Sequence, residues 1–468
     1  MDPVALTVGE AAAALRRGDV RAADYAEALL AQAARGASLN AFIHLDPAAV
    51  RAAAAAADGR RARGEVLGAL HGVPLALKDN LDTDAMPTTG GTPALREHRP
   101  KRNATIVQKL LDAGAIALGK TNLHELAYGI TNHNAAFGAA RNPYDPRRIP
   151  GGSSGGVGVA VAARMAPAGI GSDTGGSVRI PAALCGIVGF RPTTGRWSQQ
   201  GIVPISHTRD TAGPMARSVA DCALLDAVVT GSTPAPAATL NGVRLGVPRA
   251  HFWQALDSET ARLLEAVLVR LKDAGAVLVE ADVPDVARLD NEAGFPIALH
   301  ETVVDLDAYL GSHGSPLRYR ELVAQCASPD VAGLLQSLHG DAAVPEAAYR
   351  HALDVLRPQL QAAFRDHFAR HDVVAIVFPT TPLPAAPIGD DETVLLNGER
   401  VPTFPTFIRN SSPGSVAGIP GISVPAAMTA AGLPLGLELD GPAGSDARLL
   451  AIAAAVEAVL PDTPAPRL

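Results

Sequence analysis

The sequence predicts an α/β protein with a large, mixed and mostly buried central sheet that is covered by helices on both faces. Short apolar runs bounded by glycine, proline or polar residues recur along the chain, as expected of buried strands. Longer amphipathic or alanine-rich stretches alternate with these runs, which favours an α/β arrangement. The chain has 468 residues, 47% hydrophobic and 19% charged, so it can bury an extensive core.

The N-terminal part is expected to begin with helices. They are predicted over residues 7–17, 22–34 and 47–63. The first has a clear start signal, because Thr7 followed by Glu10 fits a capping box. The apolar run 73–77 lies between Gly72 and Lys78 and predicts a buried strand that ends at Lys78.

The alternation continues to the C-terminus. Asn103 is expected to cap a helix that stops at Gly114, residues 115–120 form a strand, and another helix starts near Asn122 or Leu123. Further helices are predicted at 155–165, 217–230, 257–274 and 445–459, and strands at 168–171, 243–247, 276–281, 373–382, 423–428 and 435–441, with a loop at 172–177. We expect a single domain over residues 1–468, with a mostly helical peripheral insertion or cap at 285–370.

Composition excludes several classes of function. The formal net charge is −7 and there is no basic stripe, so nucleic-acid binding is not expected. No run approaches the 18 apolar residues of a membrane span, and the N-terminus carries acidic residues where a signal peptide needs a basic start. These features predict a protein of the cytoplasm with no membrane partner.

Cysteine and histidine usage indicates neither a disulfide framework nor a metal centre. Cys185, Cys222 and Cys326 are far apart, form no CxxC pair, and are interpreted as reduced core thiols. The histidines show no spacing typical of metal ligands, so neither a metal nor another cofactor is expected.

Lysine is rare, with five residues in the whole chain, at positions 78, 101, 109, 120 and 272. The other basic residues are arginines. An amine can lose its proton when it is buried, whereas a guanidinium cannot. Lys78, at the end of an apolar strand, is therefore a candidate for a role that needs a neutral base.

Two loops rich in glycine and serine lie on either side of an Ala/Val stretch, with Ser153 and Ser154 in the first and Ser177 in the second. A flexible linker is disfavoured because apolar residues flank the first loop closely. A phosphate cradle is disfavoured because neither loop holds the lysine of a P-loop, and no acidic residue follows at the ribose-binding position. The favoured hypothesis is nucleophilic catalysis by serine.

Ser177 follows Thr174, Gly175 and Gly176, and this turn can direct successive N–H groups at one point to bind a developing oxyanion. A serine nucleophile requires a base. The chain has no clear GxSxG elbow followed by Asp and His. His207 lies in the loop SHTRD and is interpreted as a surface or hydrogen-bonding residue, so Lys78 remains as the candidate base.

Three motifs in this order resemble the amidase signature family. They are PLALKDN around Lys78, GGSSGG at 151–156, and SDTGGSVRIPAALCGIVGFRPT at 172–193. The segments LGKTNLHELAYGITNHNAAFGAARNPYD, GIVPISHTRDTAGPMARSVAD and SPGSVAGIPGISVPAAM are similar to the indoleacetamide and mandelamide hydrolase branch of that family. One small departure is Ser172, where the family often has threonine; the hydroxyl is kept.

The resemblance implies an amidase signature fold and a Ser-Ser-Lys triad. In this triad Ser177 is the nucleophile, Ser153 is the bridging serine that follows a cis peptide bond, and Lys78 is the base. The N–H groups of Thr174, Gly175, Gly176 and Ser177 are expected to form the oxyanion hole, and Tyr128 and Gly129 to line the substrate pocket. Arg179 is expected to brace the second loop through Asp173 or Asp210.

The implied reaction is hydrolysis of a carboxylic amide to an acid and ammonia or an amine through an acyl-enzyme. The resemblance favours a small aryl or arylalkyl amide as substrate. Two alternatives stay open: a carbamate or ester hydrolase of the same family, and the glutamine-hydrolysing subunit of a tRNA-dependent amidotransferase. Homodimer formation also stays open.

Overall fold

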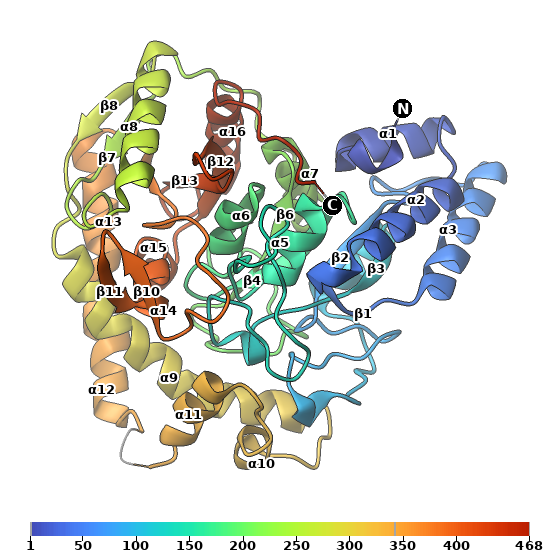
Figure 1. The fold of residues 1–468 in the computed structure, drawn as a ribbon, viewed down its shortest axis with the longest axis horizontal. Coiled ribbons are helices and arrows are strands. Elements are labelled where there is room, and N and C mark those ends of the chain that lie inside the picture. The colour runs from blue at the N-terminus through green and yellow to red at the C-terminus, as the bar shows by residue number, and fades with distance from the viewer. Residues whose placement is uncertain (1, 341–342, 468) are drawn as a thin grey trace.

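The computed structural model describes residues 2–340 and 343–467 (Figure 1). Its main feature is an 11-stranded mixed sheet with the strand order β1-β3-β2-β4-β6-β5-β12-β13-β9-β7-β8. The strands are β1 (Phe42–His44), β2 (Pro74–Lys78), β3 (Ile116–Thr121), β4 (Ala168–Asp173), β5 (Val188–Arg191), β6 (Thr211–Ala216), β7 (Arg244–Val247), β8 (Val277–Glu280), β9 (Ala375–Pro379), β12 (Gly421–Met428) and β13 (Pro434–Asp440). Helices lie on both faces of this sheet, which confirms the predicted fold class.

Sixteen α-helices are distributed along the described part of the chain. They are α1 (Val8–Arg17), α2 (Ala22–Arg35), α3 (Pro47–Ala62), α4 (Thr105–Asp112), α5 (Gly155–Ala162), α6 (Arg179–Cys185), α7 (Val219–Thr230), α8 (Ser258–Asp273), α9 (Val286–Ser312), α10 (Tyr319–Val323), α11 (Pro329–Ser337), α12 (Glu346–His351), α13 (Arg357–His371), α14 (Thr403–Ile408), α15 (Ser412–Ala417) and α16 (Asp446–Glu457). A separate hairpin pairs β10 (Thr393–Leu396) with β11 (Glu399–Pro402).

Two parallel neighbours in the sheet position the candidate site. Strand β2 pairs in parallel with β3 on one side and with β4 on the other. Every residue of β2 and of β4 is buried. Because the carboxyl ends of parallel strands meet at one edge of a sheet, the chain leaves β2 after Lys78 and β4 after Asp173 on the same side.

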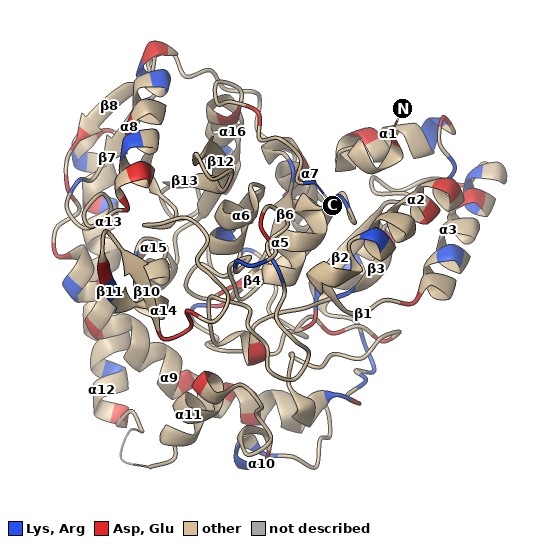
Figure 2. Cartoon of the chain, in the orientation of Figure 1, with Lys and Arg blue, Asp and Glu red and all other residues tan. Residues whose placement is uncertain are grey.

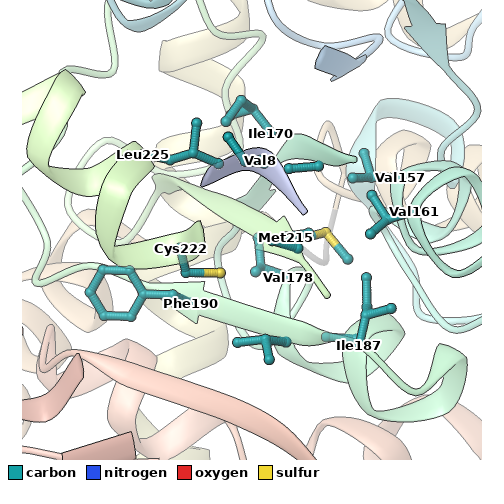
Figure 3. Close-up of a cluster of buried hydrophobic side chains, with 14 of the residues drawn as sticks. Val8, Val157, Val161, Ile170, Val178, Ile187, Phe190, Met215, Cys222 and Leu225 are labelled. Carbon is teal, nitrogen blue, oxygen red and sulfur yellow. The ribbon is translucent and has the colours of Figure 1, made fainter. Parts of the chain in front are cut away.

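Helices α5 and α7 pack on the middle of the sheet and close the core there (Figure 3). Met215 of β6 lies among Val157 and Val161 of α5 and Cys222 of α7. Cys222 and Cys185 are buried and free, and Cys326 is half-buried and free. The interpretation of the cysteines as unpaired thiols is therefore confirmed.

The segment predicted to be helical at 285–370 contains α9 to α13, and α9 to α12 lie along the lower edge of Figure 1. Helix α9 reaches back to the sheet, since Tyr309 donates a hydrogen bond to Asp82 at 2.7 Å, four residues after β2. Whether this segment is an insertion in one domain of 468 residues stays a prediction.

Three local predictions were wrong. Asn103 does not cap α4, because its side chain accepts the backbone N–H of Asp84 at 3.0 Å, and the cap position is Ala104. The helix expected near Asn122 or Leu123 is one short 3-10 turn, at Glu125–Ala127. The expected loop at 172–177 starts later, because residues 172 and 173 pair with β6 and extend β4.

Tertiary hydrogen bonds explain the lost helix. The side chain of Asn122 donates to the carbonyls of Asn40 and Gly138. The carboxylate of Glu125 accepts the backbone N–H groups that precede α11, including that of Ser328 at 2.6 Å. Leu126 has a positive φ of 51°, which no α-helix adopts. These contacts override the local helical pattern.

Acidic and basic residues are interspersed along the outer helices α2, α3 and α8 (Figure 2). Among the residues described, no helix is both long and apolar enough to cross a bilayer.

Candidate active site

Lys78 is the last residue of β2, and its side chain is fully buried beside the first serine loop. Its Nζ atom lies 2.8 Å from Oγ of Ser153 and 2.9 Å from Oγ of Ser172. Asn80 donates a hydrogen bond to the same Ser172 oxygen at 2.9 Å. The amine is therefore held by two hydroxyl groups.

Burial controls the charge of Lys78. Within the described part of the chain, no carboxylate lies within ion-pair distance of its Nζ atom. Burial lowers the pKa of Lys78 to about 7, although the charges of Asp173 and Asp210 oppose this effect. The other buried lysine, Lys120, differs because it forms an ion pair with Asp79 at 3.0 Å.

The two serine loops meet in space. The backbone N–H of Ser154 donates to the carbonyl of Ser177 at 3.1 Å, and the Ser154 hydroxyl donates to the carbonyl of Ser172 at 3.1 Å. The peptide bond between Gly152 and Ser153 is cis. A Cβ atom on Gly171 would lie 2.8 Å from the Ser154 hydroxyl, so glycine is what permits this approach.

Hydrogen bonds fix the orientation of the turn at 174–177. The carbonyls of its first three residues accept hydrogen bonds from neighbouring segments: Thr174 from Arg209 at 3.0 Å, Gly175 from Ser411 at 2.7 Å and Gly176 from Ile180 at 2.7 Å. In a trans peptide the N–H of the next residue points opposite to the carbonyl. The N–H groups of Gly175, Gly176 and Ser177 are thereby directed away from these partners.

One of these N–H groups, that of Gly176, already has a hydrogen-bond acceptor within the protein. Gly176 N–H donates to the carboxylate of Asp173 at 2.8 Å. The predicted oxyanion hole included this group together with those of Thr174, Gly175 and Ser177. The N–H groups of Thr174, Gly175 and Ser177 share one arrangement: the carbonyl on the other side of each peptide accepts a hydrogen bond, for Thr174 the carbonyl of Asp173 from Arg191 at 2.5 Å, and the described residues offer none of the three an acceptor.

Asp173 is the centre of a buried ion network behind the turn. It pairs with Arg179 at 3.1 Å and with Arg191 at 3.0 Å, and Arg179 also pairs with Glu438. Burial disfavours the carboxylate, but the two guanidinium groups outweigh burial and hold the pKa of Asp173 well below its ordinary value. Arg179 was expected to hold the second loop through Asp173 or Asp210, and its ion-pair partner in this loop is Asp173. Asp210 accepts a hydrogen bond from the hydroxyl of Thr174 at 2.5 Å.

Asp173→Asn should lower the free energy of unfolding by about 3–5 kcal/mol, because it leaves buried arginines without their shared charge. Urea unfolding followed by tryptophan fluorescence measures the change. Asp372→Asn is the matched control, since Asp372 is 92% exposed and forms only a surface ion pair with Arg244. If the two variants unfolded at the same urea concentration as the parent, the network would not stabilise the turn.

A cavity of about 330 Å³ opens beside the turn. Thr174, Gly175 and Ser177 form part of its wall, and Tyr128 and Gly129, which were predicted to line the pocket, do so. Tyr128 shares a short hydrogen bond with Thr302 of α9. Ser177 therefore borders a space large enough for a small molecule.

Sequence reasoning missed most of the cavity wall. The residues that it did not identify come from α9, α11 and the segment 391–412: Asp290, Gly294, Phe295, Ala298, Leu299, Asp330, Leu334, Asp391, Phe404, Ile408 and Ser412, together with Ile205 and Arg209. These residues are distant in sequence from the serine loops and form no local motif. Asn80 and Ser172 could have been found, because both lie directly beside the carboxyl ends of the predicted strands.

In two places, side chains that could bind a metal ion lie close together, although the spacing of these residues in the sequence does not indicate it. The two groups are Asp82 with His98 and His313, and His207 with Glu301 and Asp305. Neither group lines the cavity. Hydrogen bonds account for the first, since Asp82 bonds both His313 at 2.9 Å and Tyr309 at 2.7 Å. His207 is 56% exposed and lies 3.0 Å from Asp305, as expected of a surface hydrogen-bonding residue.

Comparison with known proteins defines the class. The amidase family model matches residues 24–450. An indoleacetamide hydrolase of Agrobacterium vitis is 44% identical over 95% of this chain and 94% of its own length. A mandelamide hydrolase of Pseudomonas putida is 41% identical over 98% of this chain and 92% of its own.

The fold agrees with the sequence comparison. The X-ray structure of a peptide amidase from Stenotrophomonas maltophilia superposes with a TM-score of 0.85, at 33% identity, over 99% of this chain and 98% of that one. The chain belongs to the amidase signature family. It is an amidase, an enzyme that hydrolyses the carbon–nitrogen bond of amides.

Proposed function

We propose that this enzyme cleaves its amide through an acyl-enzyme on Ser177, with Lys78 as a neutral base and Ser153 as the bridge between them. The observation that carries the proposal is the 2.8 Å contact between Nζ of Lys78 and Oγ of Ser153, made by a buried lysine without a carboxylate partner. The hydrogen bond from the Ser154 N–H to the Ser177 carbonyl supports placing the second loop beside this pair.

In the first half-reaction, the lone pair of neutral Lys78 accepts the proton of Ser153, and Ser153 accepts that of Ser177. The Ser177 oxygen attacks the carbonyl carbon and forms a tetrahedral intermediate with a negative oxygen. The carbon–nitrogen bond then breaks, the departing nitrogen takes the proton back from Ser153, and Ser153 recovers its proton from Lys78.

In the second half-reaction, water takes the place of the departed amine. It loses a proton through Ser153 to Lys78 and attacks the ester on Ser177. The carbon–oxygen bond of that ester breaks, the serine recovers its proton, and the acid leaves.

The turn at 174–177 is proposed to stabilise the negative oxygen of both intermediates. The N–H groups of Thr174, Gly175 and Ser177 are the proposed donors, because the carbonyl on the opposite side of each peptide is fixed by a hydrogen bond. Gly176 contributes by holding the turn on Asp173, to which its own N–H donates.

An aryl or arylalkyl acyl group is the proposed substrate class. The rings of Phe295 and Phe404 lie with centroids 6.2 Å apart, and both residues line the cavity. Aromatic rings pack favourably at such distances. The substrates named for the two hydrolase relatives, indoleacetamide and mandelamide, are both amides with an aromatic ring. Carbamates and esters of similar shape are the alternative substrates, since the same acyl-enzyme forms from them.

We further propose that the enzyme acts on a small-molecule amide without a cofactor, a nucleic acid or a membrane, in the cytoplasm, alone or as a homodimer. The glutamine-hydrolysing subunit of an amidotransferase is disfavoured by the apolar lining around Phe295 and Phe404.

Consumption of each substrate by the purified protein, followed by liquid chromatography, tests the proposal. The panel contains four amides, which are phenylacetamide, indole-3-acetamide, hexanamide and glutamine. It also contains an ethyl ester and a carbamate that each carry a phenyl group. We expect kcat/KM for the aryl amides to exceed that for hexanamide by about tenfold or more, because an aromatic group fills the apolar wall. Cleavage of glutamine in preference to every aryl amide would refute the proposed substrate class.

The rate should fall on acidification with an apparent pKa near that of Lys78. The pKa of this amine is lowered to about 7 by burial, so the neutral, active form dominates above pH 7 and the charged, inactive form below it. We expect kcat/KM to reach a plateau above pH 8 and to fall about tenfold per pH unit well below pH 7. Initial rates from pH 5.5 to 9 at constant ionic strength measure this profile. A rate that stays constant from pH 6 to pH 8 would contradict a neutral lysine base.

A further inference from the structure

One side of the cavity carries a cluster of three polar side chains, in addition to the acidic residues Asp330 and Asp391 elsewhere in the wall. The cluster consists of Arg209, which precedes β6, Asp290 on α9 and Ser412 at the start of α15. Asp290 and Ser412 are each 8% exposed, and Arg209 is 5% exposed. Charged side chains are seldom buried unless they are paired, so their contacts indicate what this wall can bind.

Arg209 is held rigidly but without a carboxylate. It donates from Nη1 to the carbonyl of Gly294 at 2.6 Å and from Nη2 to that of Thr174 at 3.0 Å. Among the described residues, no carboxylate lies within ion-pair distance of it, and its buried Nε has no acceptor. Arg209 therefore connects the turn at 174–177 to α9 and leaves a positive charge at the cavity wall.

Asp290 has an unused acceptor. Its Oδ1 atom accepts the hydroxyl of Ser412 at 2.9 Å, whereas no donor in the described part of the chain bonds Oδ2. Burial raises the pKa of Asp290 to about 6, against the opposing effects of Arg209 and the Ser412 hydrogen bond. The group is thus mainly ionised at neutral pH. Its Oδ2 atom is not among the fully buried side-chain oxygens without a partner, and Asp290 lines the cavity, so this oxygen is accessible to a bound molecule.

The two charges limit the kind of molecule that fits beside them. The opposite charges of Arg209 and Asp290 border the same cavity, so a full charge on the acyl group would be attracted by one of them and repelled by the other, and the two effects would largely cancel. A neutral group with an N–H or O–H would satisfy the free oxygen of Asp290 and meet no repulsion. An apolar group would leave this oxygen unpaired after water has been expelled.

We propose that Asp290 selects neutral amides whose acyl group carries a hydrogen-bond donor, and that its carboxylate accepts that donor. This inference rests on the proposed hydrolysis of aryl amides. It adds a specificity-determining residue on α9, far from the serine loops in sequence.

Two matched pairs of substrates, of which the first is isosteric, test the inference. Indole-3-acetamide and benzofuran-3-acetamide differ in a ring N–H, and mandelamide and phenylacetamide differ in a hydroxyl next to the carbonyl. We expect the parent to favour the donor member of at least one pair by about tenfold or more in kcat/KM. Asp290→Asn should reduce that ratio to near one, because Ser412 keeps the amide oxygen occupied and the NH2 group replaces the free acceptor.

Glu292→Gln is the matched control, because Glu292 lies on the same helix but is exposed and bonded to Arg288. Its substrate ratios should equal those of the parent. If the parent cleaves none of the four amides, the proposed aryl amide substrate is wrong. If it cleaves both members of each pair equally, or if the preference survives Asp290→Asn, the aryl amide activity stands and the role of Asp290 is wrong. If Asp290→Asn does not fold, the parent ratios at pH 5 replace it: the carboxyl of Asp290, with its pKa raised to about 6, is then mainly protonated, so the preference should shrink, and an unchanged ratio would refute the role of Asp290.

Discussion

Ser177→Ala is expected to reduce kcat for amide hydrolysis by on the order of 10⁴- to 10⁶-fold, which would be the largest effect of any single substitution in this chain. The alanine cannot form the ester intermediate, and the remaining groups can only orient water. Ser177 borders the cavity, and the other hydroxyl of the turn, on Thr174, donates to Asp210, so Ser177 is the better candidate nucleophile of the second loop.

Residual ammonia release by Ser177→Ala should be measured at high enzyme concentration with the best amide of the panel. Ser198→Ala is the control, because Ser198 is exposed and outside the cavity. Thermal unfolding at the parent temperature excludes a folding defect. If a well-folded Ser177→Ala enzyme lost less than about tenfold, another nucleophile would have to be sought.

Lys78→Arg is expected to be nearly as damaging as Lys78→Ala, with a loss of about 10²- to 10⁴-fold in kcat/KM for both. The reason is chemical, because a guanidinium keeps its proton and cannot act as a base. Nζ of Lys78 lies 2.8 Å from Oγ of Ser153, and burial lowers its pKa to about 7, so the lysine can be neutral at physiological pH. If positive charge were the requirement, arginine would restore much of the rate.

The comparison needs a control for the substitution itself. Lys272→Arg changes an exposed lysine on α8 in the same way and should leave the rate unaltered. Both Lys78 variants must unfold at temperatures close to that of the parent. A folded Lys78→Arg enzyme with activity within a few-fold of the parent would assign Lys78 an electrostatic role.

The serine loops and Lys78 could be located from the sequence because their signals are local. Glycines that permit a close approach lie directly beside Ser153 and Ser177, and the apolar run before Lys78 predicts a buried strand end. The structure places these segments together through the parallel pairing of β2 and β4. Local patterns also predicted most helices, as the capping box of Thr7 and Glu10 illustrates.

The rest of the site depends on contacts between distant segments. Asp290 and Phe295 reach the cavity because α9 packs against α13 and α15, and Phe404 and Ser412 reach it from near the other end of the chain. No pattern around these residues indicates that arrangement. Long-range hydrogen bonds also explain why the helix predicted near Asn122 does not form. Asn122 bonds residues about 16 and 82 positions away, and these contacts outweigh the local helix propensity.

Mapping the covalent adduct of a fluorophosphonate probe tests the central claim most directly. The probe reacts with an activated serine and stays attached, and mass spectrometry of the digested protein then locates it. The account predicts one adduct on Ser177, formed in parallel with the loss of activity and greatly slowed by Lys78→Arg. An adduct on Ser153 or Ser154 in place of Ser177 would contradict it.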